Sequence, residues 1–352
     1  MYDQGPARLV KAKAMADEAV RLQPDLAEAH MALGRYYWQG KKAPDGSDYE
    51  MARREFEFAK RSLPNDAEIE SALGRIDRDE GKWDEAITHL ERAASLDPNT
   101  PERWHRLFAT YEHCRDFPAA AQALERAIAL APNPWPFMQH RAFLQLFWKG
   151  DLSEMKNLPP PPNDPDGVQT WSFVKAKLCL RQFDEAAEIL RQDPHENLPA
   201  GEQVVPKIFL LGMVSFMAGD TTAASAFFET ARSAIEKTTQ EYPPGDSRHL
   251  LQAQLYAGLG LNAQALAELK PVEAKRLDFS TVHRVAEIYA MLGDAEHATP
   301  LLQHLLSIRS FCFARELRVS PRWDPIRDDL RFQKLAAQAD VVFPANHPLV
   351  KR

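Results

Sequence analysis

The residues of this sequence that could take part in acid–base chemistry are carboxylates and imidazoles at short spacing. Two pairs of aspartates are near neighbours, Asp77 with Asp79 and Asp328 with Asp329. Neither pair has a partnering base beside it, so solvated helix ends explain both better than a general acid–base pair does. His297 and His304 are seven residues apart and would share one helix face, which is typical of surface or groove histidines. None of these arrangements predicts a catalytic site.

The motifs that bind phosphates, nucleotides or zinc, or that carry a catalytic serine, are absent from the sequence. The eleven histidines include no H-x3-H pair, and Cys114, Cys179 and Cys312 form no C-x-x-C pair. Three widely spaced thiols are typical of small buried side chains in a reducing compartment. We therefore predict no catalytic residue, no metal ligand and no cofactor, and we predict that the protein is not an enzyme.

The elements that would have to position such residues follow an internal repeat of 34 residues. Five sets of residues keep this step: Pro64, Pro98 and Pro132; Ala52, Ala86 and Ala120; Ala59, Ala93 and Ala127; Leu90 and Leu124; Leu73 and Leu107. Five sets in phase predict repeated supersecondary units that each pack on their neighbours.

Each repeat is predicted to form two helices. In the first, Leu33 and Tyr37 share one face, and Gly34 leaves room for a partner helix to approach closely. The second helix has a narrow apolar stripe, formed by Ala52, Phe56 and Ala59. Pro64 then ends the helix and redirects the chain.

This pattern resembles the tetratricopeptide repeat (TPR), a helix–turn–helix with W-x2-L-G-x2-Y, then A-x3-F, then Pro. Later units keep it with more drift, as in Trp104, Leu107, Tyr111, Leu211 and Gly212. The resemblance implies an all-α, right-handed α-solenoid of about seven to eight antiparallel helical hairpins. It also implies that the chain works by binding other proteins.

The repeat divides the chain into predicted segments. These are 1–24, the second helix of a hairpin whose first helix is missing; 25–150, an N-terminal array; 151–166, a proline-rich connector; 167–308, a C-terminal array; and 309–352, a cap and tail. The four prolines of 159–162 exclude a helix, so the hairpin that begins at Trp135 should have a stunted second helix. Extra residues around 41–48 predict a longer turn. The first segment leads us to expect that the chain is cut from a longer protein.

Residues 318–335 do not follow the repeat. They contain W-D-P-I-R-x-D, then R-F-x-x-L, and resemble the closing segment of TPR regions at the C-termini of bacterial multidomain regulators. Those include serine/threonine kinases, adenylate-cyclase-like proteins and winged-helix regulators. Leu330 stands where such endings often have proline. The resemblance implies a regulatory or scaffold arm of a larger bacterial protein, in which Trp323, Ile326, Phe332 and Leu335 form a helical cap.

The first helices of successive hairpins would line a concave groove in this architecture. The phase of the repeat places these residues in it: Arg35, Trp38, Arg75, Arg78, His105, Phe143, Phe147, Trp171, Phe209, Met213, Phe216 and Met217. The arginines suit an acidic peptide or a terminal carboxylate, or they form a solvated charged face. The Met and Phe side chains suit an adaptable peptide site, or they are buried within the array.

Charge and hydropathy restrict the partners. The net charge is −7, with scattered lysines and arginines, whereas nucleic-acid binding needs a concentrated basic face. Apolar stretches such as 208–217 are too short to span a bilayer. We therefore predict a protein or peptide ligand, no nucleic acid and no membrane insertion of this chain. We expect a cytoplasmic location, or an extracytoplasmic one if a membrane span precedes Met1. The alternative function is a scaffold that self-assembles into a homo-oligomer through its open N-terminal face.

Overall fold

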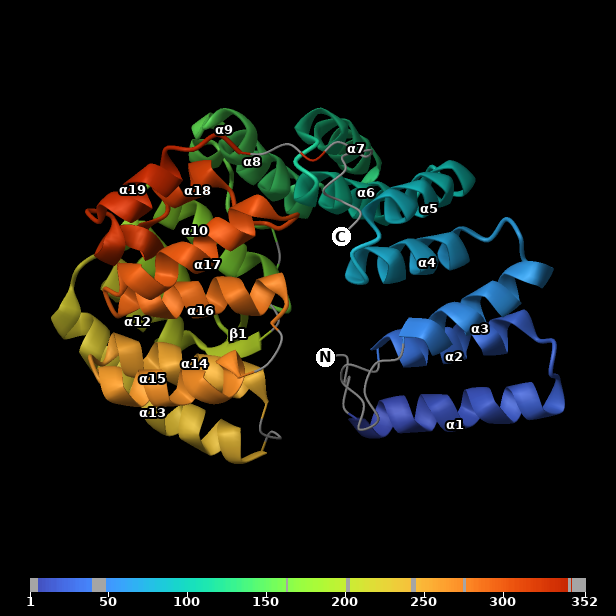
Figure 1. Ribbon diagram of the computed structural model, residues 1–352, viewed down its shortest axis with the longest axis horizontal. Coiled ribbons are helices and arrows are strands. Elements are labelled where there is room, and N and C mark those ends of the chain that lie inside the picture. Colours follow the sequence, from blue (N-terminus) through green and yellow to red (C-terminus); the bar gives the residue numbers. More distant parts are fainter. Residues whose placement is uncertain are drawn as a thin grey trace. The chain divides into compact units, whose positions relative to one another are not determined.

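The computed structural model describes residues 6–39, 49–162, 164–200, 203–241, 245–274, 277–340 and 343. The longer turn predicted around 41–48 lies outside these residues. The described residues belong to two compact units (Figure 1). The first comprises Met1–Phe137 with the residues from 342 onward, and the second comprises Met138–Val341. The predicted connector, 151–166, therefore lies within the second unit, and the boundary between the units falls in the sequence between Phe137 and Met138.

The first unit is built from antiparallel helical hairpins. Its helices are α1 (Pro6–Leu22), α2 (Ala27–Gln39), α3 (Tyr49–Ser62), α4 (Ala67–Asp79), α5 (Trp83–Leu96), α6 (Pro101–His113), α7 (Phe117–Leu130) and the start of α8 (Trp135–Lys149). Within it α2 packs on α3, α4 on α5 and α6 on α7. The arrangement confirms the predicted hairpins of 25–132.

The second unit continues with α9 (Ser153–Lys156), α10 (Val168–Cys179), α11 (Phe183–Gln192), α12 (Lys207–Met217), α13 (Thr221–Glu241), α14 (Asp246–Gly258), α15 (Asn262–Glu273), α16 (Phe279–Met291) and α17 (Ala295–Ser307). Consecutive helices pair as α10 with α11, α12 with α13, α14 with α15 and α16 with α17. Helix α9 has four residues, as expected before a run of prolines. The all-α solenoid predicted from the repeat is confirmed.

The small residues of the repeat are where two helices of a hairpin touch. Ala52, Ala86 and Ala120 have no exposed surface. A Cβ added to Gly34 would lie 2.8 Å from Cε2 of Phe56, so the ring occupies the space that glycine leaves open. The small residues that repeat along the sequence are therefore the positions at which the two helices of a hairpin touch.

Aspartates begin several of the helices. Asp66 accepts hydrogen bonds from the backbone N–H groups of Glu68, at 2.8 Å, and Ile69, at 2.9 Å, at the start of α4. Asp116 and Asp294 cap α7 and α17 in the same way. A side-chain oxygen at this position satisfies amide donors that have no partner within the helix.

A short β-hairpin was not predicted from the sequence. Strands β1 (Asn197–Ala200) and β2 (Gln203–Pro206) are antiparallel, and Leu198 pairs with Val205. Both of these side chains are buried in the second unit's core. Each strand has four residues and contains proline, so the sequence shows no alternating apolar pattern to identify it.

The cap predicted at the C-terminal end is present. It consists of α18 (Ala314–Val319), the 3-10 helix η2 (Pro321–Ile326) and α19 (Leu330–Ala336). Trp323, Ile326, Phe332 and Leu335 are each at most 2% exposed and belong to the core of the second unit. Helix α19 packs on α17, and η2 packs on α16. The cap thus covers the last hairpin, as expected.

Candidate functional site

Three arginines of α4 and α6 form a cationic surface in the first unit. We call Arg75, Arg78 and Arg106 the arginine face. The guanidinium carbon of Arg75 lies 3.8 Å from the ring centroid of Trp38, close enough for a cation–π contact. The indole Nε1 of Trp38 donates a hydrogen bond to Asp79 at 3.2 Å. Two of the predicted groove residues, on α2 and α4, are therefore brought together.

Burial and mutual repulsion disfavour the charged form of the arginines in the arginine face. The pKa of Arg75 is lowered to about 10, first by burial and then by the neighbouring charges of Arg106 and Arg78. Burial, followed by cationic neighbours that include Arg78, also lowers the pKa of Arg106, against the attraction of Glu68. Like charges that lower one another's pKa are close in space and incompletely neutralised.

Few carboxylates compensate these arginines. Glu68 accepts a hydrogen bond from Arg103 at 2.8 Å, and its oxygen lies 3.8 Å from Arg35. Arg78 lies 3.6 Å from Asp79. Arg106 donates to the hydroxyl of Ser71. Within the described part of the chain, neither Arg75 nor Arg106 has a carboxylate at ion-pair distance.

His105, another predicted groove residue, is held among aromatic rings. Its ring centroid lies 5.7 Å from that of Phe108 and 5.2 Å from that of Phe137. Burial lowers its pKa, which favours the neutral imidazole. His105 therefore adds an aromatic edge beside the arginine face rather than a positive charge.

A buried ionic network behind this surface was missed by the sequence analysis. Asp77 is 2% exposed and accepts a hydrogen bond from Arg53 at 2.8 Å, so the interpretation of Asp77 as a solvated helix end is corrected. Glu70 is 1% exposed and lies 2.6 Å from His89 and 3.1 Å from Lys60. Burial alone would raise the pKa of Glu70, but the hydrogen bonds from His89 and Lys60 hold it below its usual value. The network joins α3, α4 and α5 and supports the helix that carries Arg75.

Two predicted groove residues of the second unit are in its core. Phe209 and Met213 are only 3% and 5% exposed. The Phe209 ring packs against Phe228 of its own hairpin, with centroids 5.6 Å apart. Their assignment to an accessible groove is corrected, because α12 is apolar on most sides and both side chains face other helices. Trp171 and Phe216 are half-buried and pack against the same core.

The remaining predicted residues of the second unit face the chain's own cap. Phe147 stacks on Phe313, with centroids 4.2 Å apart. Phe143 and Met217 line a small hollow of about 30 Å³, which is room for one water molecule. Lys175 lines the same hollow. The spacing of the repeat predicted that these side chains share the face formed by the first helices. The cover over that face comes from a distant part of the chain, which the spacing does not predict.

Lys175 is a half-buried cation in this hollow. Burial, and then the charge of Arg322, lower the pKa of its amine to about 8. Arg322 lies 3.5 Å from Glu287 and 3.7 Å from Glu316. The thiol of Cys179, which also lines the hollow, has its pKa raised to about 12 by burial. Such a thiol is a weak nucleophile, which argues against chemistry at this site.

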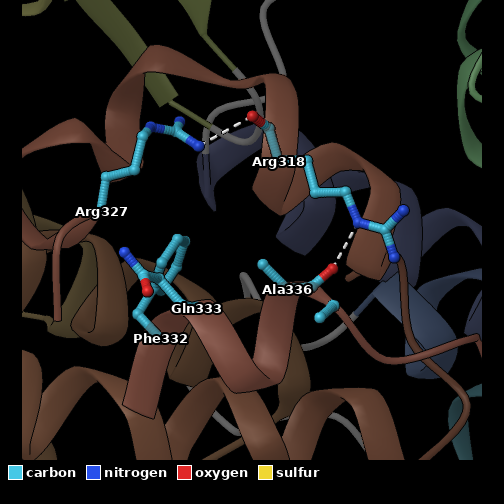
Figure 2. A pocket seen from close by; sticks show the side chains of 6 residues that line it. Arg318, Arg327, Phe332, Gln333 and Ala336 are labelled. Carbon is cyan, nitrogen blue, oxygen red and sulfur yellow. Dashed lines mark hydrogen bonds between the residues drawn. The ribbon is translucent and has the colours of Figure 1, made fainter. Parts of the chain in front are cut away.

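A second hollow, of about 430 Å³, lies in the cap (Figure 2). Arg327 donates to the carbonyl oxygen of Arg318 at 2.7 Å, and Arg318 donates to the carbonyl of Ala336 (Figure 2). Phe332 and Gln333 also line it. Both guanidinium groups are therefore bonded to carbonyls at the C-terminal ends of α18 and α19, and they brace the cap rather than offer an anion site.

No group of three or more His, Cys, Asp or Glu side chains among the described residues is placed to hold a metal ion. None of the helices described above combines the length and the apolar character needed to cross a membrane.

Comparisons with known proteins bear on the helices that carry the arginine face. Residues 74–112 match the family model of the TPR repeat. This part contains a TPR unit. It extends from α4 to α6 and includes Arg75, Arg78, His105 and Arg106. No curated protein matches the chain.

Solved structures that resemble the chain include TPR proteins. The crystal structure of MamA is 18% identical, covers 50% of this chain and 89% of its own, and has a TM-score of 0.36. A tetratricopeptide repeat protein from Parabacteroides merdae is 14% identical and has a TM-score of 0.36. The match covers 88% of this chain and 97% of that protein. PilF of Pseudomonas aeruginosa is 15% identical and has a TM-score of 0.36. The match covers 74% of this chain and 95% of PilF.

Proposed function

We propose that this chain is a protein-interaction module that binds an acidic peptide segment along the first helices of its first unit. TPR arrays are extended surfaces on which partners bind. The observation that carries the proposal is the arginine face, in which three guanidinium groups share too few carboxylates. An Asp- or Glu-rich segment would supply the missing negative charge.

The chemistry of the surface suits this ligand. Guanidinium groups bind carboxylates with two parallel hydrogen bonds. Trp38 holds the Arg75 guanidinium against its ring, which reduces the side-chain entropy lost when a ligand binds. Arginine and tryptophan are also the residues that most often carry binding energy at interfaces. His105 and the exposed Arg35 would extend the contact along the groove.

The test is a charge reversal on the arginine face. Arg75→Glu with Arg78→Glu should weaken binding of a fluorescein-labelled Glu-rich peptide by about tenfold or more, because each change removes an attraction and adds a repulsion. Fluorescence anisotropy at low and at high salt measures the affinity, which should also fall as salt rises.

The matched control is Arg54→Glu with Arg126→Glu, which makes the same change in net charge at exposed positions of second helices. The control should bind as the wild type does. Equal loss in both double variants, or no binding of the acidic peptide by the wild type, would overturn the proposal.

We also propose that the chain is the regulatory arm of a larger bacterial protein. The support is the resemblance of residues 318–335 to the endings of TPR regions in such regulators. The coding sequence upstream of Met1 tests it, because an effector domain in the same reading frame is expected there. The free, buried cysteines support a cytoplasmic location for this arm. A chain released from the membrane fraction only by detergent would contradict that location.

The second candidate function is self-assembly through α1. Met15 and Leu22 are both 65% exposed, and Val10 is 52% exposed. Met15 and Leu22 are seven residues apart and lie on one face of the helix. Exposed apolar side chains at this spacing favour pairing with the same helix of a second copy.

A further inference from the structure

After its last hairpin, the chain runs across the first helices of hairpins in the second unit. Helix α17 ends at Ser307, and we call residues 311–324 the capping segment. It contacts α8, α16 and Arg181, just after α10, and shares a hollow with α10 and α12. Each of these four helices is the first helix of a hairpin. We call the surface of these four helices the first-helix face. In a TPR array, this is the face on which partners are usually bound.

Aromatic side chains of the capping segment dock on this face. Phe313 has no exposed surface and stacks on Phe147 of α8 at an interplanar angle of 18°. Phe311 lies against Phe279 and His283 of α16, with ring centroids 5.3 and 5.2 Å apart. Such contacts are the kind that anchor a peptide in a groove.

Polar contacts hold the same segment at both ends. Arg315 donates to the last carbonyls of α8, those of Phe147, at 3.0 Å, and Trp148. At the other end, Arg181, just after α10, binds Asp324 with two hydrogen bonds. Both pairs join residues more than 140 positions apart in sequence, since their separations are 168, 167 and 143.

The small hollow of about 30 Å³ marks the seam between the segment and the face. Phe143, Lys175, Leu178, Cys179 and Met217 line it from the array, and Glu316, Ser320, Pro321 and Arg322 line it from the capping segment. Lys175 faces Arg322, Glu287, Glu316 and the thiol of Cys179. At this hollow the seam is therefore charged and imperfectly packed, although Leu317 and Trp323 of the same segment are fully buried in the core.

We propose that the capping segment is an intramolecular peptide ligand of the first-helix face, so that the second unit is closed to partners until this segment is released. The segment lacks the repeat's periodicity, as a ligand of the array would. Each hairpin from α10 to α17 already packs its own two helices together. The proposal concerns the second unit and stands whether or not the first unit binds acidic peptides. The contacts of Phe311, Phe313 and Arg315 define the competing partner as a peptide rich in aromatic and basic residues.

Cys179 is a built-in reporter of release. It is 7% exposed and lines the seam, so its alkylation requires the capping segment to move. In the full chain, Arg315→Glu places a carboxylate against the last carbonyls of α8 and should repel the segment. We expect alkylation of Cys179, followed by peptide mapping, to become about tenfold faster or more. Amide hydrogen exchange within α12–α15 should stay as slow as in the wild type.

A synthetic peptide with the sequence of residues 309–324, added in excess, should slow alkylation of the variant again by occupying the vacated face. Arg191→Glu, an equal charge change at an exposed position of α11, is the matched control and should leave Cys179 as slow as in the wild type. Arg181→Ala, which removes only the Asp324 contacts, is the milder release variant if Arg315→Glu does not fold.

The outcomes separate a ligand from a core element. If α12–α15 lose protection whenever Cys179 becomes reactive, the segment is part of the core and the proposal is wrong. The proposal is equally overturned if the peptide fails to restore protection, or if neither release variant accelerates alkylation.

Discussion

Two cations, Arg75 in the first unit and Lys175 in the second, have pKa values lowered mainly by burial. They differ in their surroundings. Arg75 lies half-buried against an indole ring beside other arginines, where an incoming anion would stabilise it. Lys175 lines the small hollow beside the capping segment and, within the described residues, has no hydrogen bond or ion pair. At the scale of single residues, the surroundings of Arg75 support the proposed binding of an anion, whereas those of Lys175 should lower the stability of the folded state.

Lys175→Met should therefore stabilise the protein. The pKa of the Lys175 amine is about 8 in the folded chain, against 10.5 as its ordinary value. Between these pH values the unfolded chain holds more protons, so the stability of the wild type rises with pH across this window. We expect the variant to be more stable by about 1–3 kcal/mol at pH 7, and this difference should shrink as the pH approaches 10.5.

Urea unfolding of both chains at pH 7 and pH 10 measures this effect. Lys270→Met, at an exposed position of α15, is the control and should change stability little at either pH. A loss of stability in Lys175→Met at pH 7 would show that the amine is well compensated by Glu287 and Glu316.

At the scale of elements, the hairpins depend on a close approach between two helices. Gly34 of α2 faces the Phe56 ring of α3, and Gly74 of α4 faces Leu90 of α5, each with 2.8 Å between the neighbour and a Cβ built on the glycine. A larger side chain must push the second helix away, because packed interiors leave no room for it. The repeat thus sets the helix spacing through glycine and alanine.

Gly34→Val should destabilise the first unit by about 1–3 kcal/mol, since the added methyl groups overlap the Phe56 ring. Ala32→Val is the control, because Ala32 is on the exposed face of the same helix and bears only the helix-propensity cost of valine, about 0.5 kcal/mol. Hydrogen exchange of α2 and α3 reports the change locally. Equal effects of the two substitutions would mean that the hairpin can open to accept the side chain.

At the scale of the whole molecule, the proposed self-assembly would bury the exposed apolar side chains of α1, Met15 and Leu22. If α1 pairs with a second copy, light scattering with size-exclusion chromatography should show a dimer at micromolar concentration. Met15→Glu with Leu22→Glu should yield a monomer, because charges would be buried at the contact. Lys11→Glu with Glu28→Lys, a neutral exchange at exposed positions, is the control. A wild type that is monomeric at every concentration would contradict self-assembly.

Much of the fold follows from the repeat. The 34-residue step, the alanine and glycine sets and the prolines predicted the hairpins, because each of those residues acts on its own or a neighbouring helix. The apolar positions of the cap, Trp323 among them, could be identified for the same reason. The candidate site was predicted in part: Arg75 and Trp38 meet, whereas Phe209 and Met213 are in the core. The buried pairs of Asp77 with Arg53 and of Glu70 with His89 were not foreseen.

The sequence by itself therefore determined the helices, their pairing and the residue types available on each first helix. Only the tertiary structure decided which of those residues are open to a partner. Exposure depends on contacts between positions far apart in the chain, such as Phe147 with Phe313 and Arg181 with Asp324. Local periodicity carries no information about these contacts, because it reports only the residues that one helix presents to its neighbours.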